Sequence, residues 1–203
     1  MNLEFGLISL VILIFSAILH EIAHGIMAER LGDPTARLSG RLTLNPILHI
    51  DPYLSILLPL ILIIAQSPVI FGGAKPVPVD PFNLRDGRKD MALVSLAGPL
   101  TNFVIAIGFA GIIHLVPLET VGPFVYHVLY LIVQLNLLLG IFNLVPIPPL
   151  DGSKIWTILL PERDALRFMN VGNAGFILIF AFLYLFGGII SSLLGFALNL
   201  LGL

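Results

Sequence analysis

Long apolar segments constrain this chain more than any other feature of its sequence. They cover about residues 3–29, 53–72, 91–118, 121–142 and 172–203. Only 11% of the 203 residues are charged. Because lipid cannot pair with main-chain amides, such segments cross a bilayer as helices. The sequence therefore predicts an all-α polytopic membrane protein, a bundle of about four to six transmembrane segments.

The connectors between these segments are short, so we expect residues 1–203 to form a single integral-membrane domain. The chain has no cysteine, which excludes disulfides and thiolate metal ligands. No basic cluster alternates with aromatic residues, so nucleic acid is excluded as a partner. The lipid bilayer is the partner that the composition requires.

Positive charge indicates the orientation of the chain. All ten Lys and Arg residues lie in the connectors 30–52, 73–90 and 143–171. The positive-inside rule places these connectors in the cytoplasm and the N-terminus outside. Because the connectors before and after it share one side, the segment near 53–80 should be re-entrant or interfacial and should not cross the bilayer once.

The stretch LHEIAHG at residues 19–25 carries three ionisable side chains inside the first apolar segment. On a helix, His20 and His24 lie one turn apart on the same face and can hold one metal ion. Glu21 beside them can take a proton from a metal-bound water, as in H-E-x-x-H metallopeptidases. Ionisable residues within a membrane segment are costly, which favours this function over a packing role.

A catalytic zinc site needs a third protein ligand, and Asp151 is the best candidate. It ends the stretch FNLVPIPPLDG, where three prolines prevent a regular helix. A stiff, extended strand there can carry a carboxylate back to the metal. The competing interpretation is an ordinary proline-rich loop that ends in Asp-Gly.

Three motifs together resemble the site-2 protease family of intramembrane zinc metalloproteases, in a compact form without PDZ or CBS domains. They are LHEIAHG, SLAGPLTN at 95–102 and NLVPIPPLDG at 143–152. The resemblance implies a catalytic core at about 3–155, followed by a C-terminal membrane segment at 172–203. It also implies one Zn²⁺ per chain, bound by His20, His24 and Asp151, with Glu21 as the general base. In that family, the residue that matches Asn143 helps to position the substrate or to stabilise the oxyanion.

The expected function is hydrolysis of peptide bonds in or near the transmembrane segments of other membrane proteins. The expected location is a prokaryotic cell membrane, with several passes and with the active site toward the cytoplasm. The alternative is a zinc-binding membrane protein without proteolytic activity, for transport or for a structural zinc. His49 is the spare histidine that would close a structural site.

Two polar side chains and two connector segments have less certain roles. Asn102 either bonds within the active-site cavity or joins helices as a polar contact. For His49, an interfacial loop position is favoured over the cytoplasmic mouth of the site. Residues 36–44 are a candidate β-hairpin and residues 75–79 a candidate extended segment. Either one would pair with an unwound substrate by strand addition.

Overall fold

The computed structural model describes residues 3–65, 73–172 and 174–203, and this part of the chain contains helices and no strand. The helices are α1 (Leu3–Arg30), α2 (Thr35–Leu38), α3 (Leu58–Ile64), α4 (Gly87–Leu115), α5 (Leu118–Asn143), α6 (Asp151–Trp156), α7 (Glu162–Met169) and α8 (Ala174–Leu200). Short 3₁₀ or π turns lie at Pro46–Leu48, Pro52–Leu57, Pro81–Asn83 and Thr157–Leu159. Among the described residues, α1, α4, α5 and most of α8 are long and apolar enough to cross a membrane. The prediction of an all-α polytopic membrane protein is confirmed.

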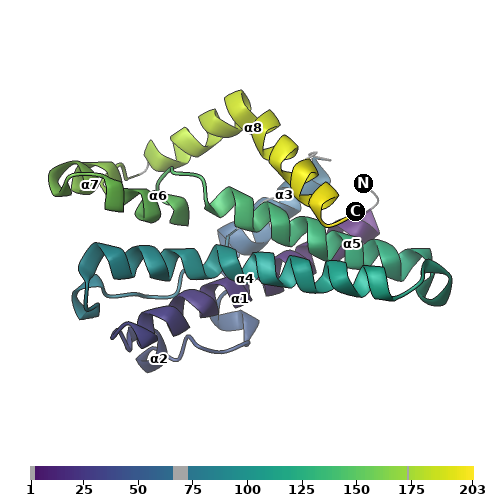
Figure 1. The fold of residues 1–203 in the computed structure, drawn as a ribbon, viewed down its shortest axis with the longest axis horizontal. Coiled ribbons are helices and arrows are strands. Elements are labelled where there is room, and N and C mark those ends of the chain that lie inside the picture. Colours follow the sequence, from purple (N-terminus) through teal and green to yellow (C-terminus); the bar gives the residue numbers. More distant parts are fainter. Residues whose placement is uncertain (1–2, 66–72, 173) are drawn as a thin grey trace.

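Helices α1, α4 and α5 form the centre of the molecule. Figure 1 shows α4 and α5 side by side along the longest axis, with α1 crossing beneath them. Small residues permit this close packing, because Ala106 and Ala110 are buried and a Cβ at Gly140 would lie 2.8 Å from the Phe103 ring. Helix α5 is kinked near its start at Gly122, whose φ of 77° favours glycine.

Helix α8 arches over α5 and is attached near its two ends (Figure 1). Near its start, Gly175 packs against the carbonyl of Pro148, where a Cβ would not fit. Beyond its last turn, the ring of His114 bonds to the carbonyl of Leu201 through Nε2 at 2.6 Å. An apolar groove separates α5 from the middle of α8, and Leu144 and Val145 line it near α6.

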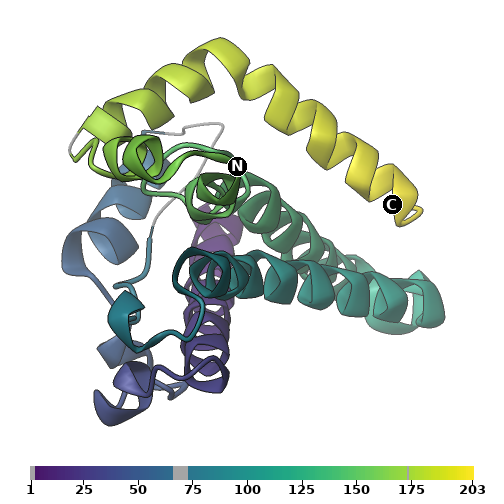
Figure 2. The same cartoon turned by 60° about the vertical axis from the view of Figure 1, so that its left-hand side comes forward.

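The connector region between α1 and α4 lies on the other side of α1 from α5 (Figure 2). The prediction of a β-hairpin at 36–44 is wrong, because the chain forms α2 there and then turns at Gly40. The carboxylate of Asp33 accepts a hydrogen bond from the Thr35 amide at 3.0 Å and thereby starts the helical turn.

The apolar segment after this region is too short to cross a bilayer in its described part. Pro52–Leu57 has 6 residues and α3 has 7, so the two helical turns together have 13. Their length is about 20 Å, whereas the hydrocarbon core of a bilayer is about 30 Å thick. The Ser55 hydroxyl donates to the carbonyl of Gly73 at 2.5 Å. Gly73 therefore lies beside Ser55, near the start of the segment, as expected of a re-entrant or interfacial segment. Residues 66–72 of the expected returning arm lie outside the described residues.

Residues 73–80 form an extended segment that hydrogen bonds hold against residues 41–49 of the same connector region. The Lys75 amide donates to the carbonyl of His49 at 2.8 Å. The Arg41 guanidinium donates to the carbonyls of Lys75 and Pro76 at 2.7 and 3.2 Å. These bonds fix the 73–80 segment against Arg41 and His49.

Asp33 joins three parts of the connector region. It is fully buried and accepts hydrogen bonds from the Asp80 amide at 2.7 Å and from the Asn83 side chain at 3.0 Å, besides the bonds from Thr35. Burial by itself would raise the pKa of Asp33. The hydrogen bonds from Thr35, Asn83 and the Asp80 amide outweigh it and hold this pKa below the ordinary value of 3.8.

Replacing this carboxylate should destabilise the protein. Asp33→Asn presents an amide NH₂ to donors, so the free energy of unfolding should fall by about 1–3 kcal/mol at neutral pH. Because the folded pKa is depressed, the contribution of Asp33 is complete above pH 3.8 and is lost as the pH falls through the folded pKa. The difference between wild type and variant should therefore shrink below pH 3.8.

The measurement is thermal unfolding in detergent, followed by circular dichroism at several pH values. Asp164→Asn is the control, because Asp164 lies on exposed α7 and its nearest cation is Arg167 at 3.9 Å. It should change the stability by less than about 1 kcal/mol. An Asp33→Asn protein as stable as wild type at neutral pH would contradict the role assigned to this junction.

Candidate metal centre

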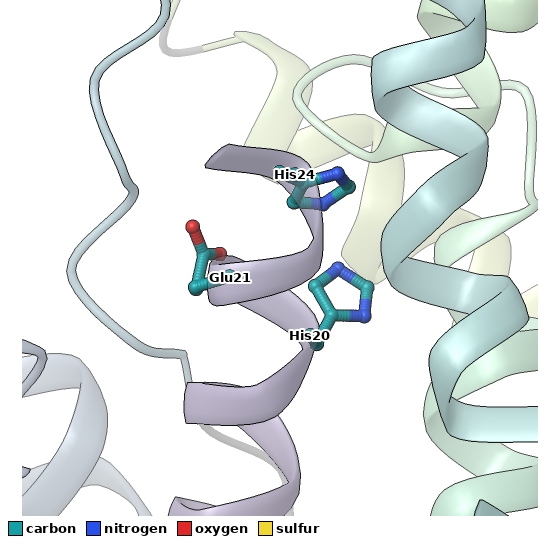
Figure 3. Close-up of side chains that lie close together, drawn as sticks. All are labelled: His20, Glu21 and His24. Atoms are coloured by element: carbon teal, nitrogen blue, oxygen red, sulfur yellow. The ribbon is translucent and has the colours of Figure 1, made fainter. Parts of the chain in front are cut away.

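Helix α1 brings together His20, Glu21 and His24. One ligand atom from each of the three lies within 4.8 Å of the others. Figure 3 shows both histidine rings on the side of α1 that faces α4, with the Glu21 side chain directed to the other side of the helix. The i, i+4 spacing accounts for the shared face of the two rings.

Asp151 reaches the two histidines from the first turn of α6. Its Oδ2 lies 3.0 Å from Nε2 of His20 and 3.1 Å from Nε2 of His24. Gly152 makes this approach possible, because a Cβ there would collide with the main chain of Leu144 and would lie 2.6 Å from the carbonyl oxygen of Val145. The start of α6 therefore packs directly on the backbone of the proline-rich loop.

The electrostatic surroundings keep Asp151 ionised. Burial by itself would raise the pKa of Asp151, but the positive charge of Lys154, 3.4 Å from its Oδ1, lowers this pKa and stabilises the carboxylate. Asp151 is thus a hydrogen-bond acceptor only.

Both histidines present Nε2 to Asp151, because their other ring nitrogens are engaged elsewhere. Nδ1 of His24 lies 2.7 Å from the carbonyl oxygen of Val94. A carbonyl can only accept, so Nδ1 carries the proton and Nε2 of a neutral ring is a lone pair. Nδ1 of His20 lies 2.6 Å from Oδ1 of Asn102.

This donor set fits a metal cation. His20, His24 and Asp151 are 6%, 8% and 7% exposed, so water has little access to their polar atoms. Nε2 of each histidine lies 3.0 or 3.1 Å from the carboxylate oxygen, and a cation placed among the three acceptor atoms would relieve their repulsion. Two imidazoles and a carboxylate are ligands that zinc accepts, and each imidazole has a polar partner behind it.

Gly98 on α4 leaves the space that such an ion needs. A Cβ at this position would collide with Nε2 of His20 and would lie 2.5 Å from Nε2 of His24. Glycine weakens a helix interior by about 1 kcal/mol relative to alanine. The α4 backbone approaches the histidines so closely here that only glycine fits.

Glu21 is held from the side away from the histidines. The Val77 amide donates to its Oε2 at 2.7 Å. Val77 stands between Pro76 and Pro78, so its N–H is the one main-chain donor of these three residues. Arg41 also donates to the carbonyls of Lys75 and Pro76, so much of the 75–77 backbone already has hydrogen-bond partners within the protein. This segment is extended as expected, but its edge is only partly free for a substrate strand.

Of the other predicted polar residues, Asn143 and His49 bond elsewhere, whereas Asn102 contacts His20. The Asn143 side chain donates to the carbonyl of Leu139, one turn earlier in α5, at 3.0 Å. The His49 ring is buried in the connector region, where its Nε2 bonds to the carbonyl of Thr43 at 2.9 Å. Asn102 contacts His20, the first of its two expected roles, and it also bonds to Asn136 of α5, the second.

Sequence reasoning did not assign roles to Gly98, Val94 or Asn136. Gly98 lies within the stretch SLAGPLTN, and its small residues were a signal of close approach. Val94 acts through a main-chain carbonyl, and no side-chain pattern identifies such a group. Asn136 is a polar residue in an apolar helix, which was a signal of polar contact between helices.

Substitution of Gly98 should remove the metal. Gly98→Ala fills the space before the two Nε2 atoms while keeping a good helix former, so the zinc content should fall from about one ion per chain to near zero. Elemental analysis of protein purified in detergent gives this ratio. Gly108→Ala on the same helix, where a Cβ would meet nothing within 4 Å, should keep its zinc. Full zinc occupancy in Gly98→Ala would contradict this location of the ion.

Comparison with known proteins gives consistent matches. The model of peptidase family M50 matches residues 109–187. "Putative zinc metalloprotease YwhC" of Bacillus subtilis (strain 168) is 39% identical over 180 residues, which are 86% of this chain and 77% of the relative. "Putative zinc metalloprotease Rip2" of Mycolicibacterium smegmatis is 36% identical over 141 residues, which are 68% of this chain and 52% of the relative.

The chain thus spans about three quarters of the first relative and about half of the second. No solved structure matches it significantly. Similarity to a relative of which the chain covers more than two thirds, together with the family match over α5 and the loop that carries Asp151, establishes the relationship. The chain belongs to peptidase family M50, the site-2 protease family of zinc metalloproteases.

Proposed function

We propose that this protein is an intramembrane zinc metalloprotease that hydrolyses peptide bonds in or near the transmembrane segments of other membrane proteins. One observation carries the proposal. Two histidine Nε2 atoms of α1, a helix long enough to cross the membrane, converge with the Asp151 carboxylate of α6, and Glu21 lies beside the histidines on α1.

In the proposed reaction, His20, His24 and Asp151 hold the ion. Zinc in such a site acts as a Lewis acid that polarises a carbonyl and makes water acidic at neutral pH. Glu21 takes the proton from the attacking water and passes it to the leaving amine. The Val77 amide orients Glu21 through Oε2 and leaves Oε1 for this exchange.

The depth of the site supports cleavage within the bilayer. His24 and His20 precede Arg30 by six and ten residues, or about 9–15 Å at 1.5 Å per residue. The apolar groove between α5 and α8 reaches Leu144 and Val145, the residues on which the start of α6 packs. A substrate helix can therefore approach through lipid and must unwind there to expose its carbonyls.

The charge pattern supports the orientation given by the positive-inside rule, with the N-terminus outside and the active site toward the cytoplasm. Bacterial relatives favour a prokaryotic cell membrane as its location. For Asn143, we propose a substrate-positioning or oxyanion role at the end of α5. To fill it, the Asn143 amide must exchange its bond to Leu139 for one to the substrate.

Zinc transport and a structural zinc are the competing functions. A structural site is closed by a fourth protein ligand, whereas a catalytic site keeps one position open. The spare histidine, His49, is bonded to Thr43 in the connector region. Within the described residues, one group of three His, Asp or Glu side chains is placed to hold an ion, whereas transport calls for a series of sites through the membrane. Both points favour the protease.

The decisive comparison is between wild type and Glu21→Gln. Because Glu21 is proposed as the base and not as a ligand, Glu21→Gln should keep about one zinc per chain and lose at least about 100-fold of the cleavage rate. The measurements are zinc content and cleavage of a panel of single-span membrane substrates in detergent. Glu29→Gln is the matched control on the same helix, where the carboxylate pairs with Arg37 near the helix end.

The Glu29→Gln protein should cut at the wild-type rate. If Glu21→Gln cuts as fast as wild type, the proposed base is wrong. If wild type holds zinc and cuts no substrate of the panel, and the metal has four protein ligands by X-ray absorption, the function is structural zinc or transport.

A further inference from the structure

A buried chain of polar side chains runs from His20 across three helices. Nδ1 of His20 lies 2.6 Å from Oδ1 of Asn102 on α4. The Asn102 amide nitrogen donates to Oδ1 of Asn136 on α5 at 3.0 Å. The Asn136 amide nitrogen donates to the Ser16 hydroxyl on α1 and to the carbonyl of Ile132, both at 2.9 Å.

The Ile132 carbonyl sets the direction of every bond in this chain. A main-chain carbonyl can only accept, so Asn136 must turn its NH₂ group toward Ile132 and its oxygen toward Asn102. Asn102 must then turn its NH₂ group toward Asn136 and its oxygen toward His20. An oxygen facing Nδ1 requires a proton on that nitrogen, which leaves Nε2 of the neutral His20 ring as a lone pair.

Burial makes this direction compulsory. Asn102 and Asn136 are 0% exposed and Ser16 is 5% exposed, so water cannot replace a mismatched partner. Flipping either amide would bring two acceptors or two donors together, at a cost of about 1–3 kcal/mol per buried group. A flipped Asn102 would also favour the His20 tautomer that carries its proton on Nε2, and that tautomer has no lone pair toward Asp151.

We propose that Asn102 and Asn136 are positioning residues that fix the tautomer and the ring orientation of His20, so that Nε2 is available to the metal. Asn102 acts directly on His20, and Asn136 acts only through Asn102. The Val94 carbonyl does the same for His24 without an intermediate. The inference rests on the proposed function in taking His20 as a zinc ligand, but its test needs no proteolysis.

The test is the zinc dissociation constant in detergent, measured by competition with a chromophoric chelator. Asn102→Leu removes the acceptor from Nδ1 and should weaken zinc binding about 10- to 100-fold, as loss of a partner behind a metal-bound histidine does. Asn136→Leu contacts none of the proposed ligands and should also weaken binding, to a smaller extent. The double variant should bind zinc no more weakly than Asn102→Leu, because the two residues act in series.

Two further variants separate positioning from a general loss of structure. Asn102→Asp keeps an oxygen acceptor for Nδ1, so it should restore the affinity to within a few-fold of wild type even if its melting temperature falls. Thr101→Val changes the neighbouring residue, whose hydroxyl donates to Ala97 within α4, and should leave the affinity unchanged. If Asn102→Leu does not fold, the comparison of Asn136→Leu with wild type carries the test.

Wild-type affinity in Asn102→Leu, or additive losses in the double variant, would overturn the inference. Failure of Asn102→Asp to recover more affinity than Asn102→Leu would overturn it as well. A wild-type protein that binds no zinc would instead overturn the proposed function. The two failures are therefore distinct.

Discussion

The convergence of three acceptor atoms in a water-poor interior is the constraint on which the rest of this structure depends. Two imidazole nitrogens and a carboxylate oxygen meet between α1, α4 and α6, although Asp151 is 131 residues from His20 in the chain. In a low-dielectric site such a cluster is unstable without a positive charge. The glycines at 98 and 152 let two backbones approach the cluster, and the prolines before Asp151 limit the freedom of the loop that delivers it.

Polar residues inside the bundle serve the same centre. In lipid, contacts between helices rely on small residues and on hydrogen bonds, and either would be sufficient for packing alone. Here the buried asparagines of α4 and α5 lie in one chain of bonds that ends at His20. Whether such a hydrogen bond only packs helices or also serves the metal site thus depends on which of its two groups is the donor. A series of hydrogen bonds that begins at the Ile132 carbonyl permits one donor direction only, and it ends with the proton of His20 on Nδ1.

The connector region illustrates where local patterns mislead. Residues 36–44 partly alternate polar and apolar side chains, which predicted a hairpin, yet the carboxylate of Asp33 starts a helical turn at Thr35. Alternation over a few residues is a weak signal beside a buried, charged hydrogen-bond acceptor. An extended segment was expected at residues 75–79. Its placement against Glu21 was not, since the bond from the Val77 amide joins residues 56 positions apart.

The sequence by itself determined the membrane class, the positions of the long helices and the shared face of His20 and His24. These features follow from local periodicity and from the exclusion of unpaired amides by lipid. It also identified Asp151 as a candidate, because few carboxylates follow a stiffened loop. Only the tertiary structure decided which backbone faces the histidines, at Gly98, and which groups stand behind them, at Val94, Asn102 and Asn136. Those relations depend on how three helices pack across long chain separations, and a linear pattern contains no distance between them.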